Sequence, residues 1–307
     1  MTAADDSAAA GAVDLADSAR SREPRRGLGQ SLAAFVSRGV VQVALLVVGA
    51  FWLVPTFGLL IASLRPEAAN TAGGWWHAFA RPAEFTVQNY RDLLHNGDIT
   101  SAFLNTIYIT VPATFLVVAV SALAGYAFAW TDFPGRDWWF LLVVGLLVVP
   151  LQVGLIPVAR LYDRLGIFGS IEGVILYHVA FGLPFAIFLL RNFFAGIPRD
   201  LLEAARMDGA TEFRLFRKVV LPLGLPAIAS LAIFQFLWVW NDLLIGLIFA
   251  GPGSRPLTVA IQQQTRQFGN NVDVISSAAF LSMIVPLIVF FAFQRYFVQG
   301  VLAGSVK

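Results

Sequence analysis

The sequence predicts an all-α membrane protein with six transmembrane helices. Hydrophobic residues make up 58% of its 307 residues and charged residues only 13%, whereas about a quarter of a soluble domain is charged. The apolar residues fall into blocks of about 20 or more, the length that a helix needs to cross a bilayer core. These blocks are continuously apolar, which favours helices over the alternating strands of a membrane barrel.

The N-terminal segment differs in composition from the rest of the chain. Residues 1–30 are rich in Ala, Asp, Ser and Arg and have no apolar periodicity. We therefore expect a disordered cytoplasmic tail, followed by one transmembrane domain at residues 31–307. The first apolar block begins near residue 39, too far along the chain and too long a block for the apolar core of a signal peptide.

Six apolar blocks have the length of a transmembrane helix. We expect these spans at residues 39–64, 103–130, 138–160, 171–194, 219–249 and 276–298. Lys and Arg concentrate in the cytoplasmic loops of membrane proteins. With the N-terminus inside, the cytoplasmic segments hold fourteen of these residues and the outer segments seven. This bias predicts an even number of spans and both termini in the cytoplasm.

The composition also excludes several kinds of site. Cysteine is absent, so disulfides and Cys-based metal sites are excluded. The three histidines, His77, His95 and His178, have no ligand spacing, and we expect no metal site. The positive charge is mostly arginine in predicted loops, which fits the fixing of membrane topology and not the binding of nucleic acid.

One cytoplasmic segment differs from the other loops. Residues 197–223 read IPRDLLEAARMDGATEFRLFRKVVLPL. Pro198 suits the first turn of a helix, and good helix formers follow from Arg199 to Met207. Gly209 can adopt the left-handed conformation that ends a helix. We therefore expect a short helix outside the bilayer, a glycine turn, and a second helix at 212–218 that enters the membrane.

The short helix has two interpretations. Leu201, Leu202 and Ala205 share one side by their i, i+3 and i+4 spacing, so the helix could rest on the lipid headgroups. Alternatively, it could dock on a protein, because two consecutive alanines allow close approach. The carboxylates of Glu203 and Asp208 would then meet arginines on that protein. The residues alone leave both interpretations open.

A family resemblance enters at this segment. The run Glu203-Ala204-Ala205-Arg206-Met207-Asp208-Gly209-Ala210, followed by Val220-Leu221-Pro222, resembles the EAA loop of bacterial ABC import permeases. The resemblance implies a type I ABC importer permease in which residues 197–218 form the loop with the coupling helix. That helix sits in a cleft of a cytoplasmic ATPase, and five residues are implied in the contact: Glu203, Ala204, Ala205, Asp208 and Gly209.

Other motifs extend the resemblance over most of residues 39–307 and favour the carbohydrate-uptake branch. They are Asn105-Thr106, Gly125-Tyr126-Ala127-Phe128-Ala129, Pro150-Leu151-Gln152, Ile156-Pro157, Trp240-Asn241-Asp242 and the ending 300–307. The ending is similar to that of the smaller permease in maltose-type and α-glucoside-type systems. The chain departs from the family pattern at Trp130, where a basic residue is usual.

The resemblance implies a set of partners in a bacterial cytoplasmic membrane. The sequence contains no G-x-x-x-x-G-K-[ST] motif, so a P-loop for ATP must lie elsewhere. The implied arrangement is an ABC ATPase dimer that binds ATP and Mg, a second and different permease subunit, and an extracytoplasmic solute-binding protein. This chain would then be a multi-pass transport subunit without cofactor or catalytic residues of its own, in contact with lipid.

Two outer regions are candidates for the translocation path or for contact with the binding protein. Asn241 and Asp242 lie toward the outer end of the fifth span, where they could alternatively form an interfacial cap or a structural hydrogen bond. Residues 251–275 are rich in amides, which can hydrogen-bond sugar hydroxyls; they include Gln262, Gln263 and Gln264. The resemblance implies that this loop reaches the sugar cleft of the binding protein. Alternatively, the loop is a solvated hairpin without a binding role.

The resemblance favours a sugar importer with a di- or oligosaccharide as cargo, and other functions are possible for a chain of this kind. An ABC permease for a non-sugar solute has the same architecture. A secondary transporter often carries charged residues within its spans, but the centres of these spans are nearly free of charge. A membrane enzyme would need paired acids, clustered histidines or a nucleophile, and a channel would need a selectivity element.

Overall fold

The structure is a computed structural model that describes residues 28–268 and 272–305. Within these ranges the chain is helical, and the sole bridge of β type joins Gly169 and Ala250. Two compact units, residues 1–57 and 58–307, are described separately. Most of the predicted tail at 1–30 lies outside the described residues, but the first helix already begins at Leu28.

The first unit contributes most of one long helix. Helix α2 runs over Leu28–Ser63 and contains Pro55, with its last residues, from Gly58 onward, in the second unit. Its apolar part, Gly39–Ser63, is long enough to cross a membrane. This agrees closely with the span expected at residues 39–64.

After the end of α2, the second unit contains a segment of short helices built around one buried arginine. The segment contains α3 (Glu67–Ala72), η1 (Trp75–Phe79), η2 (Pro82–Glu84) and α4 (Gln88–His95). Arg65 is 2% exposed and donates to the carbonyls of Ala69 at 2.9 Å and Gly74 at 3.3 Å. It also pairs with Glu84 at 3.2 Å. The Arg65 side chain thus links several short helical turns in a segment that contains no long helix.

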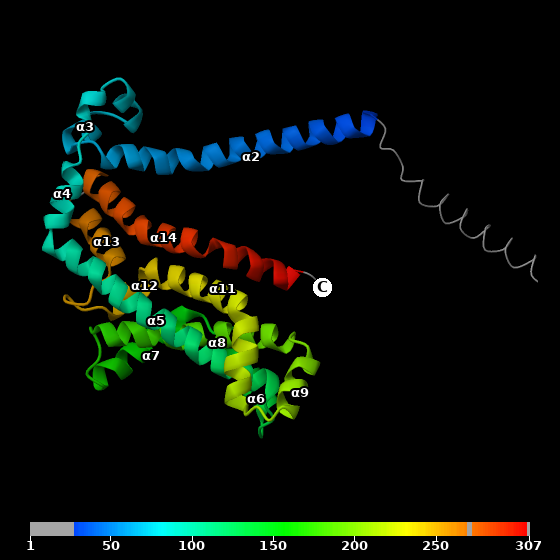
Figure 1. Ribbon diagram of the computed structural model, residues 1–307. Helices are drawn as coiled ribbons and strands as arrows, with labels where there is room; N and C mark the ends of the chain where they lie inside the picture. Colours follow the sequence, from blue (N-terminus) through cyan, green and yellow to red (C-terminus); the bar gives the residue numbers. More distant parts are fainter. Residues whose placement is uncertain (1–27, 269–271, 306–307) are drawn as a thin grey trace, which may run out of the picture. The chain divides into compact units, whose positions relative to one another are not determined.

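The centre of the second unit is the packing of α5 (Gly97–Trp130) against α8 (Ile171–Ala195), which lie side by side in Figure 1. Asn96 caps α5 by accepting from the N–H groups of Asp98 and Ile99. At Gly125 a Cβ would lie 3.0 Å from the backbone nitrogen of Arg191 and 3.1 Å from Cβ of Leu190. A residue without a side chain is therefore required for the two helices to approach this closely.

The third predicted span is not a single straight helix. The span expected at residues 138–160 consists of α6 (Arg136–Leu146) and α7 (Leu151–Arg164), which meet at an angle of 100°. Pro150 cannot donate a backbone hydrogen bond, and it disfavours a helical conformation at Val149. The Tyr177 hydroxyl on α8 donates to the carbonyl of Leu151, the first residue of α7, at 2.8 Å.

The fifth predicted span, 219–249, is divided into separate helices in the structure. A π-helical turn, η3 (Phe216–Val220), leads into α11 (Leu221–Trp240). Helix α12 (Leu244–Phe249) then starts separately. The break follows from side chains that end one helix and begin the next. Asn241 donates to the carbonyl of Leu237 at 2.8 Å, and Asp242 accepts from the N–H of Ile245 at 2.9 Å.

The last two helices complete the described bundle. Helix α13 (Leu257–Phe268) occupies much of the predicted outer loop at 251–275. Helix α14 (Val272–Ser305) packs along α11. In the described part of the chain, five helices are long and apolar enough to cross a membrane, or six if the bent pair of α6 and α7 counts as one span. The predicted all-α membrane architecture is therefore confirmed.

Arg65 provides a test of this segment of short helices. Replacing it by Met should speed amide hydrogen exchange at residues 66–84, because two part-buried carbonyls lose a charged donor, at a local cost of about 1–3 kcal/mol. Arg81→Met is the matched control. Arg81 pairs with the same Glu84 from an exposed position, and surface ion pairs contribute little. Equal exchange in the two variants would contradict the role assigned to Arg65.

Candidate functional site

The cytoplasmic segment predicted at 197–218 folds as a helical hairpin. Helix α9 spans Arg199–Met207 and begins directly after Pro198. It ends at Gly209, whose φ of +78° is left-handed, and the N–H of Ala210 donates back to the carbonyl of Ala205 at 3.0 Å. Thr211 then caps α10 (Glu212–Leu215). The expected order of short helix, glycine turn and second helix is observed.

The inner side of this hairpin is buried in the bundle. Leu202 and Leu215 are both 0% exposed and pack in one core cluster with Tyr126, Leu190 and Phe194. Full burial of a leucine side chain contributes about 1.5–3 kcal/mol, so the hairpin is held firmly against α5 and α8. Ala205 packs against the same cluster.

One detail of the predicted helix face is wrong. Leu201 was placed on the same side as Leu202 and Ala205, but it is 48% exposed. Consecutive residues on a helix point about 100° apart, so Leu202 can face the core while Leu201 lies at the edge of the buried side. The buried side follows Leu202 and Ala205, at i and i+3.

Polar contacts fix the hairpin to the C-terminal end of α5. The Tyr126 hydroxyl donates to the carboxylate of Glu212, and Arg206 pairs with the same carboxylate at 3.2 Å. Arg206 also donates to the carbonyl of Trp130 at 3.1 Å. The Trp130 indole donates to the carbonyl of Phe194 at 2.8 Å. Trp130, which departs from the family pattern, thus joins three elements.

The outer side of the hairpin is left open to solvent. Glu203, Ala204, Asp208 and Gly209 are all exposed. In the described part of the chain neither Glu203 nor Asp208 has an ion-pair partner. Three large apolar side chains share this exposure: Leu201 at 48%, Met207 at 88% and Phe213 at 68%. Sequence reasoning missed Met207 and Phe213, which add apolar area to a surface of small and acidic residues.

A polar hollow of about 120 Å³ lies beside α9. Its lining comes from the end of α5, the start of α6 and from α9, and it includes Trp130, Arg136, Arg199 and Glu203. Arg136 is already paired with Asp132 at 2.9 Å. The hollow therefore separates α9 from the α5–α6 turn, and it extends the open surface around Glu203.

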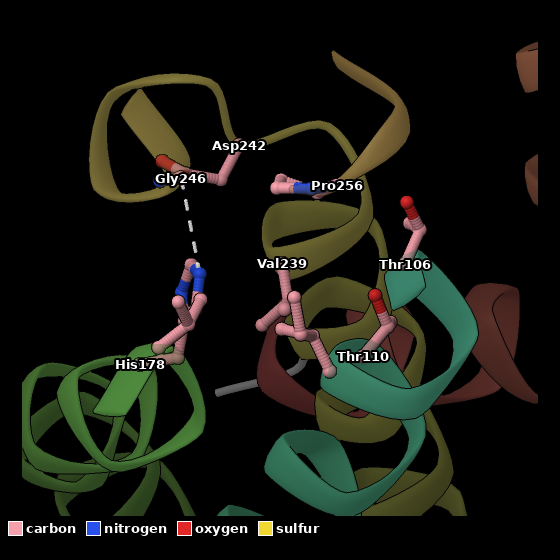
Figure 2. Close-up of a pocket in the computed structure, with 9 residues that line it drawn as sticks. Thr106, Thr110, His178, Val239, Asp242, Gly246 and Pro256 are labelled. Carbon is pink, nitrogen blue, oxygen red and sulfur yellow. Dashed lines mark hydrogen bonds and ion pairs between the residues drawn. The ribbon is translucent and has the colours of Figure 1, made fainter. Parts of the chain in front are cut away.

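The predicted outer residues Asn241 and Asp242 make local contacts. Asp242 accepts from two N–H groups at the start of α12, at 2.9 Å and 3.2 Å. Its Oδ2 also lies 3.8 Å from Nε2 of His178, as Figure 2 shows. The adjoining cavity of about 10 Å³ has room for a single water molecule. This cavity cannot hold a sugar, and the geometry gives Asp242 the position of a helix cap.

The three predicted glutamines lie on α13 and not in a flexible hairpin. Gln262, Gln263 and Gln264 are half-buried. The Oε1 of Gln263 accepts from Nη1 of Arg255 at 3.0 Å. The other amides of residues 251–275 are Gln267, Asn270 and Asn271. Their side chains lie outside the described residues. Across the part of the chain that the structure describes, no group of three or more acidic or histidine side chains could hold a metal ion.

Comparisons with known proteins place this geometry among transport proteins. The family model "Binding-protein-dependent transport system inner membrane component" matches residues 28–303. The chain is 49% identical to the osmoprotective compounds uptake permease protein of Synechocystis sp. over 87% of this chain and 91% of the relative. It is 48% identical to the α-glucoside transport system permease protein of Rhizobium meliloti, over 74% of this chain and 61% of the relative.

A solved structure shares the fold. A chain of a bacterial ABC transporter that imports the acidic polysaccharide alginate matches with a TM-score of 0.75 and 24% identity. The match covers 86% of this chain and 98% of that chain. At this identity the likeness concerns the fold of the membrane domain.

The contact between Tyr126 and Glu212 can be tested directly. Tyr126→Phe keeps the ring that packs on Phe216 but removes the donor. We expect the local stability of residues 206–216 to fall by about 1–2 kcal/mol, seen as faster amide exchange. Tyr108→Phe, on an exposed position of α5, is the control and should leave exchange unchanged. Unchanged exchange in Tyr126→Phe would show that the hydroxyl does not hold the hairpin.

Proposed function

The chain belongs to the family of binding-protein-dependent transport system inner membrane components, and on this premise we propose that it is the permease subunit of an ATP-driven sugar importer. Family membership rests on the match over residues 28–303. Proteins of this family are transport components of a membrane. The proposal adds the partners, the orientation and the cargo.

The observation that carries the proposal is the hairpin at 197–218, which has one buried and one exposed side. Its inner side is anchored by Leu202 and Leu215, while Glu203, Ala204 and Met207 face outward. An anchored helix with an open face of small, apolar and acidic groups is suited to dock on another protein. Small residues let the partner approach, and exposed apolar area is removed from water on docking.

We assign the partner on this face as a cytoplasmic ABC ATPase dimer, which binds ATP and Mg. When the two ATPase subunits close on ATP, each draws its docked helix toward the other. Because the hairpin is tied to Tyr126 and Trp130 at the end of α5, its displacement is transmitted to the transmembrane bundle. The bundle then changes between two packed arrangements, and the ATPase biases their equilibrium.

Three further assignments complete the importer. The excess of Lys and Arg in one set of loops supports a multi-pass chain with both termini in the cytoplasm of a bacterial cell. A second, different permease subunit forms the other half of the pathway. An extracytoplasmic binding protein delivers the cargo to the outer end, where α13 and its amide side chains Gln262, Gln263 and Gln264 face it.

For the cargo we favour a di- or oligosaccharide, with an α-glucoside as the first candidate. Support comes from the relative in Rhizobium meliloti, which is an α-glucoside permease by name, and from amides that suit sugar hydroxyls. A second candidate is a small non-sugar solute. The Synechocystis relative favours this alternative, because it takes up osmoprotective compounds. The chain itself is the membrane component, and we assign ATP hydrolysis to its partner.

Gly209 and Glu203 test the coupling assignment. Gly209→Val places a β-branched residue at a φ of +78°, where the left-handed conformation costs about 1–2 kcal/mol. Glu203→Lys reverses a charge on the open face. Both variants should insert normally but lose uptake of radiolabelled maltose or trehalose in proteoliposomes of the assembled importer.

Gly209→Asn is the matched control for the turn. Asparagine adopts the left-handed conformation more readily than other side chains, and the space beside Gly209 is open. This variant should therefore keep most of the uptake. Normal uptake by both Gly209→Val and Glu203→Lys would remove the coupling assignment, whatever the control does.

The cargo can be identified on the cognate binding protein. Calorimetric titration with maltose, trehalose and glycine betaine separates a sugar from a zwitterionic osmoprotective solute. We expect micromolar binding of at least one of the two sugars, because both present the hydroxyls that amide side chains hydrogen-bond. Binding of glycine betaine alone would overturn the sugar assignment and favour the second candidate.

A further inference from the structure

Two consecutive side chains at the outer part of α5 hold the segment that begins α13. Thr106 is 2% exposed, and its Oγ1 accepts from the backbone N–H of Leu257 at 2.8 Å. The same hydroxyl donates to the carbonyl of Ala102 at 2.9 Å. Figure 2 shows Thr106 close to Pro256, the residue that precedes α13.

The contact at Thr106 is a helix cap supplied by a different helix. Leu257 is the first residue of α13, and the N–H groups of a first turn have no partner within their own helix. Leu257 is also 0% exposed, so water cannot replace the hydroxyl. Loss of this acceptor would leave a buried donor unpaired, which costs far more than loss of an exposed hydrogen bond.

Asn105 fixes the turn immediately before this cap. Its Nδ2 donates to the carbonyl of Gly253 at 3.0 Å and to that of Arg255 at 3.1 Å. Arg255 in turn donates to Gln263 on α13 at 3.0 Å. A chain of hydrogen bonds thus leads from Asn105 on α5 to the amide of Gln263 on α13. Asn105 and Arg255 are 150 residues apart in the sequence.

The rest of the segment is held from other directions. The Thr258 hydroxyl donates to the carbonyl of Asp242 at 2.6 Å, and that of Ser254 donates to the carbonyl of Gly169 at 2.7 Å. Leu257 packs in a core cluster with Ile99 of α5. The segment is therefore part of the folded bundle, and Asn105 and Thr106 decide where α13 starts.

We propose that Asn105 and Thr106 are positioning residues for import, which set the place of α13 and its glutamines for the arriving binding protein. This inference rests on the proposed function for its consequence in transport. The geometric part, that two side chains of α5 fix the start of α13, stands independently. The two parts can be tested separately.

The test compares three single variants in the assembled importer. Thr106→Val keeps the shape of the side chain but removes the acceptor, whereas Thr106→Ser keeps the hydroxyl. Thr110→Val is the control one turn further along α5. The Thr110 side chain is equally buried, and its hydroxyl has no hydrogen-bond partner within the described residues, so its loss should change little.

The first measurement is amide hydrogen exchange of peptides that cover residues 253–264. In Thr106→Val this exchange should rise about tenfold, which corresponds to ~1.4 kcal/mol. Thr106→Ser and Thr110→Val should both resemble the unchanged protein. An unchanged rate in Thr106→Val, or an equal rise in Thr110→Val, would overturn the positioning role.

The second measurement is ATPase stimulation by binding protein loaded with maltose or trehalose. Thr106→Val should raise the concentration of binding protein that gives half-maximal stimulation, and Thr106→Ser should restore it. A merely structural role would lower the amount of folded complex without moving this concentration. If exchange responds as expected but the half-maximal concentration is unchanged, the role in import is refuted. If no loaded binding protein stimulates even the unchanged complex, it is the proposed function that fails.

Discussion

The close contact between α5 and α8 at Gly125 is the constraint on which the rest of the second unit depends. A side chain there would meet the backbone of Leu190 and Arg191. Because the helices approach so closely, Tyr126 and Trp130 from α5 meet Phe194 from α8 to form the floor on which the hairpin sits. In a bilayer the hydrophobic effect does not drive helices together, so close packing of the kind that Gly125 allows carries the association.

The functional contacts lie at the two ends of α5. In its N-terminal part, Asn105 and Thr106 hold the start of α13, and at its C-terminal end Tyr126 and Trp130 hold the hairpin. Figure 1 shows α13 and α9 at opposite ends of this helix. Thr106 and Tyr126 are about 30 Å apart along it, at 1.5 Å per residue. At both ends, side chains or backbone groups of α5 bind a segment that is distant in sequence. Helix α5 therefore holds both the start of α13 and the hairpin in place.

Much of this architecture could be predicted from the sequence, because it follows from local rules. Continuous apolar blocks identify the spans, and the order of Pro198, helix formers and Gly209 identifies the hairpin. The breaks were harder. Pro150 lies in a run that is apolar throughout, and membrane helices often tolerate proline. The end of α11 at Trp240 depends on caps by Asn241 and Asp242, which the apolar residues around them obscured.

The candidate site was predictable on its exposed side and not on its buried side. A local motif singles out Glu203, Ala204 and Gly209 as candidates, and the structure places all three on the exposed side of the hairpin. The contacts of Trp130 with Phe194 and Arg206, and of Thr106 with Leu257, join residues that are about 60 to 150 positions apart. No spacing rule predicts such pairs. Leu201 shows the same limit, because only the position of the bundle decides which of two adjacent leucines is buried.

The most direct test of the account uses Met207, the most exposed apolar residue of the hairpin. The chain has no cysteine, so Met207→Cys creates a unique thiol. In membranes that contain the assembled importer, a thiol cross-linker at this position should capture the ATPase subunit, with a yield that changes when ATP is added. Labelling of this cysteine by an impermeant reagent from outside the cell, without any cross-link to an ATPase, would contradict the account.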